Sequence, residues 1–253
     1  MSIVIPLHDG GFAMEQSLFP ALASQPEEAT ALIGAPFPSH FDIPVWAFAI
    51  QDARGWSLVD TGGGAMMGAG FGGVHTALNA AGINAGDITR IYLTHLHGDH
   101  CGGLLDSEES AAFPAARVAL PEAERAFWFG PHVPPEMGQI AEDARRALHP
   151  YGDRVDPVSP EDLVGAARAI DAVGHTPGHT AWAFEESDLL AVGDILHLAP
   201  LQLWRPEIAS IWDMDCEAAV ATRRAFIRRA RKTGATLLCA HGGAIPATEI
   251  PDE

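Results

Sequence analysis

Short apolar runs separated by polar turn residues recur along the whole chain. The runs at residues 43–51 and 56–60 are rich in β-branched and aromatic residues, and the stretch 52–55 between them has turn chemistry, which predicts a hairpin. A second hairpin is predicted over 181–192 for the same reason. Further strands are predicted at residues 3–7, 91–93, 117–120, 170–173 and 236–240.

Helical spacing of apolar residues alternates with these strands. It predicts helices over residues 74–81, 121–129, 140–148 and 216–232, the last one with Asp215 as its N-cap. Basic residues gather in the C-terminal half of that last helix, from Arg223 to Lys232, and predict a solvated face. A turn is predicted at residues 8–11. Residues 13–40 contain several prolines, and we expect them to form an arm or a short helix over a cleft.

Composition narrows the class of protein. The 253 residues are 47% hydrophobic and contain no linker-like segment, which predicts one domain spanning residues 1–253. The chain has 33 acidic and 15 basic residues, which gives a net charge of −18. Such a negative charge disfavours a nucleic-acid partner. The three cysteines lack metal-ligand spacing, and no stretch resembles a signal peptide or a membrane span. We therefore expect a cytoplasmic protein without a membrane partner.

The stretch Thr94-His95-Leu96-His97-Gly98-Asp99-His100-Cys101-Gly102-Gly103 is the strongest chemical signal in the chain. It follows the apolar run 91–93, so it is predicted to be a loop at a strand end. Three imidazoles and one carboxylate within six residues favour a metal cation. His95 and His97, two residues apart, can close on one ion, and Asp99 and His100 can serve a second.

Other candidate ligands also stand at strand ends. Asp194 ends the apolar run 189–192, where a carboxylate is costly unless it is paired or metal-bound. His241 follows the strand 236–240 beside two glycines. His175 and His179 share a turn built from Pro and Gly, in which both cannot easily face one point.

A glycine-rich loop over residues 62–73 precedes the helix predicted at 74–81. Such a loop suggests a phosphate cradle. It contains neither Gly-Lys-Ser/Thr nor a clean G-x-G-x-x-G, so we interpret it as a loop that starts a helix.

The run His-X-His-X-Asp-His after an apolar strand resembles the signature of the metallo-β-lactamase superfamily, and Asp9-Gly10, Asp60-Thr61-Gly62 and residues 193–223 resemble its methyl parathion hydrolase-like group. The resemblance implies an α/β fold, a four-layer αβ/βα sandwich of two mixed β-sheets flanked by helices. It also implies two divalent metal ions, with zinc favoured and manganese, iron or cobalt as alternatives. The implied ligands are His95, His97 and His179 for one ion, Asp99, His100 and His241 for the other, and Asp194 for both. His175 is then left with a structural or rim role.

This resemblance implies a hydrolase that uses a metal-bridging hydroxide to open a lactone or cleave a neutral ester, with phosphotriesters as promiscuous substrates. Asp99 is a catalytic candidate because it can steer or accept a proton. His197 is a second one. It stands three residues after Asp194, where the acyl-homoserine lactonases usually carry a tyrosine, and imidazole can also donate a hydrogen bond. The other interpretation of His197 is a core histidine.

Two other classes of function stay open at this stage. Related folds include mononuclear-iron persulfide dioxygenases, which are oxidoreductases, and a metal-bearing binding module is a third alternative. Flavodiiron proteins are disfavoured because His97 stands where they carry a glutamate. The sequence leaves open whether the chain forms a homo-oligomer.

Overall fold

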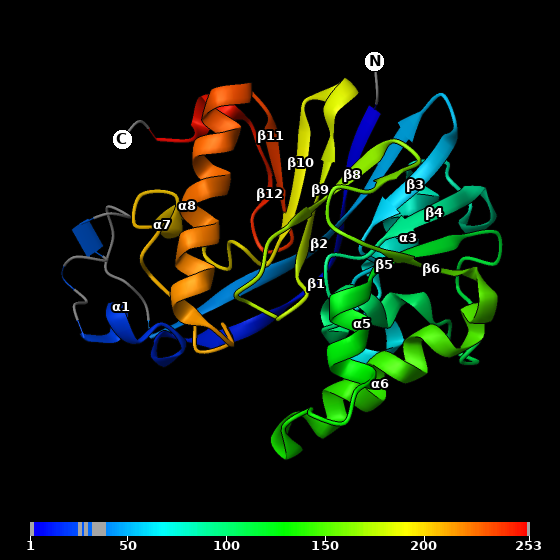
Figure 1. Ribbon diagram of the computed structural model, residues 1–253, viewed down its shortest axis with the longest axis horizontal. Coiled ribbons are helices and arrows are strands. Elements are labelled where there is room, and N and C mark those ends of the chain that lie inside the picture. The colour runs from blue at the N-terminus through cyan, green and yellow to red at the C-terminus, as the bar shows by residue number, and fades with distance from the viewer. Residues whose placement is uncertain (1–2, 25–26, 28–29, 32–38, 252–253) are drawn as a thin grey trace.

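Two six-stranded sheets form the centre of the computed structural model, which describes residues 3–24, 27, 30–31 and 39–251 (Figure 1). The strands of the first sheet, in spatial order, are β1 (Ile3–Glu15), β2 (His40–Asp52), β3 (Gly55–Val59), β4 (Ile88–Tyr92), β5 (Arg117–Pro121) and β6 (Val155–Val158). The strands of the second, in spatial order, are β12 (Gly243–Ile245), β11 (Thr236–Cys239), β10 (Leu189–Gly193), β9 (Thr180–Phe184), β8 (Ala167–Asp171) and β7 (Leu163–Val164).

Both sheets are mixed. In the first, β1, β2 and β3 pair antiparallel and β3 to β6 pair parallel. In the second, β10 and β11 pair parallel while the other neighbours pair antiparallel. The two hairpins predicted from sequence, β2–β3 and β9–β10, are therefore confirmed.

Helices cover the outer faces of both sheets, as Figure 1 shows for α8 on one side and for α5 and α6 on the other. The longer helices are α3 (Gly73–Ala80), α5 (Glu122–Phe129), α6 (Gly138–Leu148) and α8 (Cys216–Thr233), and the short ones are α1 (Pro20–Ser24), α4 (Gly98–Cys101) and α7 (Ala199–Gln202). Among the described residues, no helix is both long and apolar enough to cross a membrane.

Three apolar clusters hold these layers together. Alternate residues of β2 point to opposite faces: Ala47 and Ala49 pack toward the outer helices, while Phe48 and Ile50 pack between the sheets. Trp182 of β9 meets them there from the second sheet. Phe226 of α8 belongs to the cluster on the outer face of that sheet. The arrangement confirms the α/β sandwich expected from the sequence.

The N-terminal segment differs from its prediction. Residues 8–11 form no turn, because β1 continues through them to Glu15 and pairs with β2, with a register shift between His8 and Gly10. A long partner strand thus overrides the local turn signal of the glycines. Of the arm predicted over 13–40, the structure has the end of β1 and the short helix α1, and much of the remainder lies outside the described residues.

Candidate metal centre

The loop after β4 lies between the sheets' ends and carries four of the predicted ligands. His95 and His100 are completely buried, whereas His97 and Asp99 are partly exposed. The strand predicted at 91–93 is present as β4, which begins earlier and ends at Tyr92, and the predicted loop contains a single turn of helix, α4, that includes Asp99 and His100. The loop thus presents side chains in two directions from one strand end.

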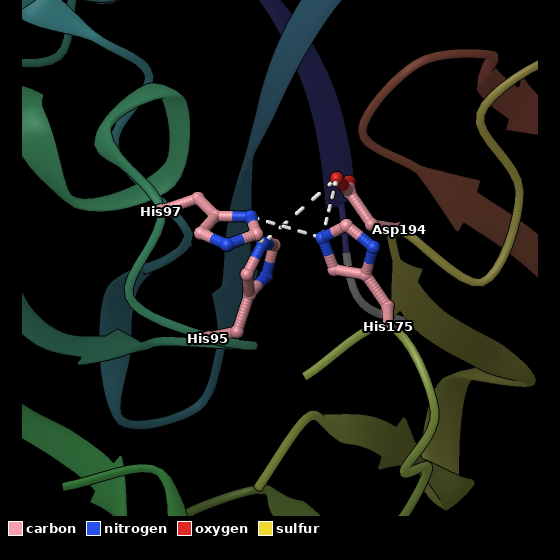
Figure 2. Close-up of side chains that lie close together, drawn as sticks. All are labelled: His95, His97, His175 and Asp194. Carbon is pink, nitrogen blue, oxygen red and sulfur yellow. Dashed lines mark hydrogen bonds and ion pairs between the residues drawn. The ribbon is translucent and has the colours of Figure 1, made fainter. Parts of the chain in front are cut away.

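Four side chains from three segments converge in Figure 2: His95, His97, His175 and Asp194. The Nδ1 atom of His97 lies 3.0 Å from Nε2 of His95 and 2.9 Å from Nε2 of His175. The Oδ2 atom of Asp194 lies 3.4 Å from Nε2 of His175 and 3.8 Å from Nε2 of His95. These four residues form the first ligand group.

A second group shares Asp194 and contains Asp99, His100 and His241. The other oxygen of Asp194, Oδ1, lies 3.0 Å from Nε2 of His100 and 3.2 Å from Nε2 of His241. Each of these nitrogens is also 3.5 Å from Oδ2 of Asp99. One carboxylate therefore has one oxygen near each group, which is the geometry expected of a bridging ligand.

The contacts between these atoms fit metal ions better than hydrogen bonds. The Nδ1 atom of His97 faces two other ring nitrogens, and one hydrogen cannot serve both contacts. The buried Nε2 atom of His100 and Oδ1 atom of Asp194 are 3.0 Å apart, yet their geometry is not that of a hydrogen bond, and neither atom has another hydrogen-bond partner. Buried polar atoms without partners are rare and call for an explanation such as an ion. Imidazole nitrogen and carboxylate oxygen are ligand atoms that zinc accepts.

The pKa shifts of the buried histidines show how their surroundings treat positive charge. Burial and then the neighbouring histidines hold the pKa of His95 well below its ordinary value, and burial also depresses the pKa of His97. Both rings are therefore neutral near pH 7, with a lone pair free to bind a cation. At His100, burial opposes the charged form, but the carboxylates of Asp194, Asp99 and Asp60 outweigh it and raise the pKa well above the ordinary value. These three carboxylates stabilise a positive charge at this position, which the protonated ring carries when no cation is bound.

Asp60, at the end of β3, holds His100 in place. Its carboxylate accepts hydrogen bonds from the backbone N–H of Thr94 (2.8 Å), the hydroxyl of Thr94 (2.9 Å) and Nδ1 of His100 (2.9 Å). Asp60 has a φ of +54°, an uncommon value outside glycine, which the surrounding bonds maintain. A carboxylate that accepts from the second nitrogen of a ligand histidine fixes its tautomer, so Nε2 of His100 is directed at the site.

The rings of His175 and His241 are oriented in the same way. Nδ1 of His241 donates to the carbonyl of Pro44 (2.9 Å), and Nδ1 of His175 lies 3.4 Å from Oδ1 of Asp213. Asp213 is in turn 3.4 Å from Arg223. The sequence predicted a solvated face for this part of α8, yet Arg223 is fully buried and donates to backbone carbonyls, Ile195 among them. The prediction is confirmed for Arg224, Arg228, Arg229 and Lys232, which are exposed, and is wrong for Arg223, which lies on the opposite, buried face of the helix.

The structure favours His175 over His179 as a member of the first group. Nε2 of His179 accepts the backbone N–H of Asp194 at 3.1 Å, so its lone pair is used behind the site. His179 belongs to none of the described clusters that could hold an ion, whereas His175 has Nε2 in the centre of one. The structure therefore places His175, and not His179, among the side chains that could hold the first ion, which differs from the roles implied by the resemblance.

His197, the second catalytic candidate, is buried beside the site. Its Nε2 atom lies 3.5 Å from Oδ2 of Asp194, and its ring contacts those of His175, His241 and Trp212. Burial lowers the pKa of His197 to about 3, and neither ring nitrogen has a hydrogen-bond partner. The residue does not line the cavity described below. A direct contact with substrate is therefore not supported by this geometry.

A cavity of about 430 Å³ opens over both ligand groups. Its floor includes His97, Asp99, His175, Asp194 and His241, and Asp143 of α6 stands among its lining residues. The other lining residues are mostly apolar: Phe12, Ala13, Met14, Met67, Gly98, Met137, Ile140, Ile211, Trp212 and Met214. A polar floor below apolar walls is typical of a small-molecule site.

The glycine-rich loop does not serve a phosphate. The carboxylate of Asp9 accepts from the backbone N–H groups of Gly63 (2.8 Å), Gly72 (3.0 Å) and Val74 (3.2 Å), including those at the start of α3. These backbone N–H groups therefore already donate to the carboxylate of Asp9. The interpretation as a structural loop fits this arrangement, and the role of Asp9 could not be read from local sequence.

The chain matches the Metallo-beta-lactamase superfamily over residues 41–241. Among solved structures, hydrolase AbOPH of the beta lactamase superfamily is 28% identical, with a TM-score of 0.87 over 95% of this chain and 87% of that one. The dizinc quorum-quenching lactonase AidC is 23% identical, with a TM-score of 0.85 over 100% of this chain and 95% of that one, which shows the shared fold.

Curated relatives match over shorter stretches. The uncharacterized protein YobT of Bacillus subtilis is 26% identical over 170 residues, which are 64% of this chain and 65% of YobT. A hydroxyacylglutathione hydrolase of Cereibacter sphaeroides is 36% identical over 111 residues, 43% of this chain and 34% of that protein. The chain thus spans less than two thirds of the length of these relatives. Since the family match nevertheless covers most of the sequence, from residue 41 to residue 241, the chain belongs to the metallo-beta-lactamase superfamily.

Proposed function

We propose that this protein is a dinuclear metal-dependent hydrolase that opens lactones or cleaves neutral carboxylic esters. The observation that carries the proposal is the position of Asp194, whose two oxygens face two separate groups of buried ligand atoms at the floor of an apolar cavity. His95, His97 and His175 with Asp194 would hold one ion. Asp99, His100 and His241 with Asp194 would hold the other.

Nitrogen and oxygen ligands without thiolate favour zinc, and manganese, iron and cobalt are also compatible with such a set. AidC, which has the same fold, is a dizinc lactonase and was solved with a hexanoyl-homoserine product. When bound, two divalent ions lower the pKa of a shared water and polarise a carbonyl oxygen. The histidines contribute ring nitrogens in fixed orientations, because Asp60, Asp213 and the carbonyl of Pro44 hold the rings of His100, His175 and His241.

Two further residues have proposed roles. Asp99 lines the cavity and reaches both His100 and His241, so its carboxylate is placed to orient a reacting group above the floor. His197 is buried against Asp194 outside the cavity lining, which supports a role in positioning that carboxylate rather than in contacting substrate.

The cavity favours a neutral and partly apolar substrate. Its ionisable lining residues outside the histidines are Asp99, Asp143 and Asp194, and no lysine or arginine from the described part of the chain lines it. The net charge of −18 also opposes the approach of anions. Hydroxyacylglutathione is itself an anion with two carboxylates, so the cavity offers that thioester no cationic partner, although the relatives named for its hydrolysis share part of this sequence.

A mononuclear-iron persulfide dioxygenase stays the alternative enzyme class, and a metal-bearing binding module the alternative without catalysis. Both ligand groups are complete in the described residues, which favours two ions over one. Phosphotriesters are proposed as promiscuous substrates, because the same centre can attack phosphorus and carbon.

A substrate panel tests the proposal. Purified protein loaded with zinc should hydrolyse neutral lactones or aryl esters, hydrolyse phosphotriesters more slowly, and leave hydroxyacylglutathione largely unchanged, as measured by product formation. Protein treated with a chelator and dialysed serves as the control and should be inactive. Consumption of a thiol persulfide with oxygen uptake and an iron requirement, without ester hydrolysis, would move the protein to the oxidoreductase class. No turnover of any of these compounds by a metal-loaded sample would favour the binding module.

A further inference from the structure

Glu124, on the first turn of α5, is a charged side chain without any exposed surface. Its carboxylate accepts four hydrogen bonds. Oε1 accepts from the backbone N–H of Leu96 (3.0 Å) and from Nε1 of Trp128 (2.6 Å). Oε2 accepts from the hydroxyl of Thr176 (2.7 Å) and from the backbone N–H of Gly178 (3.1 Å). Four donors fill the acceptor capacity of an ionised carboxylate, so this buried charge is fully satisfied.

These four donors lie next to the proposed ligands of the first ion. Leu96 is the residue between His95 and His97, and Thr176 directly follows His175. A single carboxylate therefore ties together two loops that lie about eighty residues apart in sequence.

Close packing fixes the same junction. A Cβ atom at Gly178 would lie 2.0 Å from the backbone nitrogen of Glu124 and 2.4 Å from its Cα, so the loop of His175 touches the start of α5 directly. Only glycine permits this approach, since real Cβ atoms do not come closer than about 3 Å. Close packing opposes a shift of the His175 loop toward α5. The hydrogen bonds from Thr176 and Gly178 to the carboxylate of Glu124 oppose a shift away from it.

Glu124 also acts on His97 indirectly, through the side chain of Trp128. The indole of Trp128, held by its bond to Glu124, is fully buried and packs edge-on against the ring of His97 with 5.6 Å between centroids. His97 contributes Nδ1 to the first group, and on that side its ring contacts those of His95 and His175. The indole that Glu124 orients thus helps to fix the orientation of this ring.

We propose that Glu124 is a positioning residue that sets the distance between the pair His95 and His97 and the ring of His175, and thereby the affinity and geometry of the first metal ion. The inference rests on the proposed dinuclear centre. The second group, whose rings are oriented by Asp60 and Pro44, does not depend on Glu124. Loss of the carboxylate should therefore weaken one ion selectively.

The test compares Glu124→Gln with Glu122→Gln, an exposed residue on the same turn of α5, after loading with Co²⁺. Glutamine has nearly the shape of glutamate but loses the charge and turns two acceptor sites into an NH₂ group that faces donors. Competition with a chelator should show one Co²⁺ bound about 10–100-fold more weakly and the other unchanged, the range found for second ligand shells. The visible Co²⁺ spectrum should change for that ion alone. Glu122→Gln should match the wild type in both measurements.

Thr176→Val provides a milder variant, because it removes one of the four donors without altering size. It should weaken the same ion by less than Glu124→Gln does, and it carries the test if the glutamine variant does not fold. A lower melting temperature with both Co²⁺ affinities and the spectrum unchanged would overturn the proposal, since Glu124 would then be a purely structural residue. Equal weakening of both ions would overturn it too.

These readouts need no substrate, so they separate this inference from the proposed activity. A wild-type chain that binds two Co²⁺ ions but hydrolyses no ester would contradict the proposed function. The Co²⁺ affinities of the Glu124 variant would still decide the role of Glu124 in that case. A wild-type chain that binds no Co²⁺ would contradict both.

Discussion

Replacement of Asp194 by alanine is expected to lower kcat/KM for the best ester or lactone about 1000-fold. Asp194 is the one residue that both ligand groups share, so its loss removes a ligand from each ion and the negative charge between them. Removal of metal-based polarisation costs several kcal/mol, and about 4 kcal/mol corresponds to three orders of magnitude in rate. The variant should also bind fewer than two ions per chain.

Steady-state kinetics and plasma mass spectrometry on the same samples check this expectation. Asp171→Ala, which removes an exposed carboxylate at the end of β8, is the matched control and should keep wild-type rate and metal content. An Asp194→Ala protein that retained two ions and more than a tenth of the activity would show that this carboxylate bridges nothing.

The second large effect separates His175 from His179. His175→Asn should lose one of the two ions and lower kcat/KM about 100-fold or more, because its Nε2 atom lies among the ligand atoms of the first group. His179→Asn should keep both ions. It should instead lower the free energy of unfolding by about 1–3 kcal/mol, because the buried N–H of Asp194 loses its acceptor.

Metal content, activity and thermal unfolding of the two variants decide the matter. Two bound ions in His175→Asn and one in His179→Asn would reverse the assignment and restore the ligand set implied by sequence resemblance. The two substitutions are chemically identical and both sites are buried, so a difference between them reports position rather than side-chain type.

Much of the site could be predicted because its ligands follow strands. The apolar runs before Thr94, Asp194 and His241 are local signals, and each places a polar side chain at a strand end. The hairpin of β2 and β3 was likewise encoded by neighbouring residues. Sequence periodicity therefore sufficed for most of the strands and for the loop after β4, but it did not reveal the short strands β6, β7 and β12.

The choice between His175 and His179 could not be made in that way. Both stand in one Pro-Gly turn, and the direction of that turn depends on its contacts with Glu124 and the start of α5, about fifty residues away in sequence. The burial of Arg223 and the partnership of Asp60 with His100 also rest on long-range contacts. The strand through residues 8–11 forms because β2 offers a partner, which no local pattern reveals.

The most direct measurement of the central claim is an activity titration of the metal-free protein. Zinc is added stepwise to chelator-treated protein, hydrolysis of a neutral ester or lactone is followed, and bound metal is determined by plasma mass spectrometry at each step. A dinuclear hydrolase should reach its maximal rate at two zinc ions per chain and show little activity without them. A maximal rate already reached at one zinc ion per chain, or a rate independent of metal, would contradict the account.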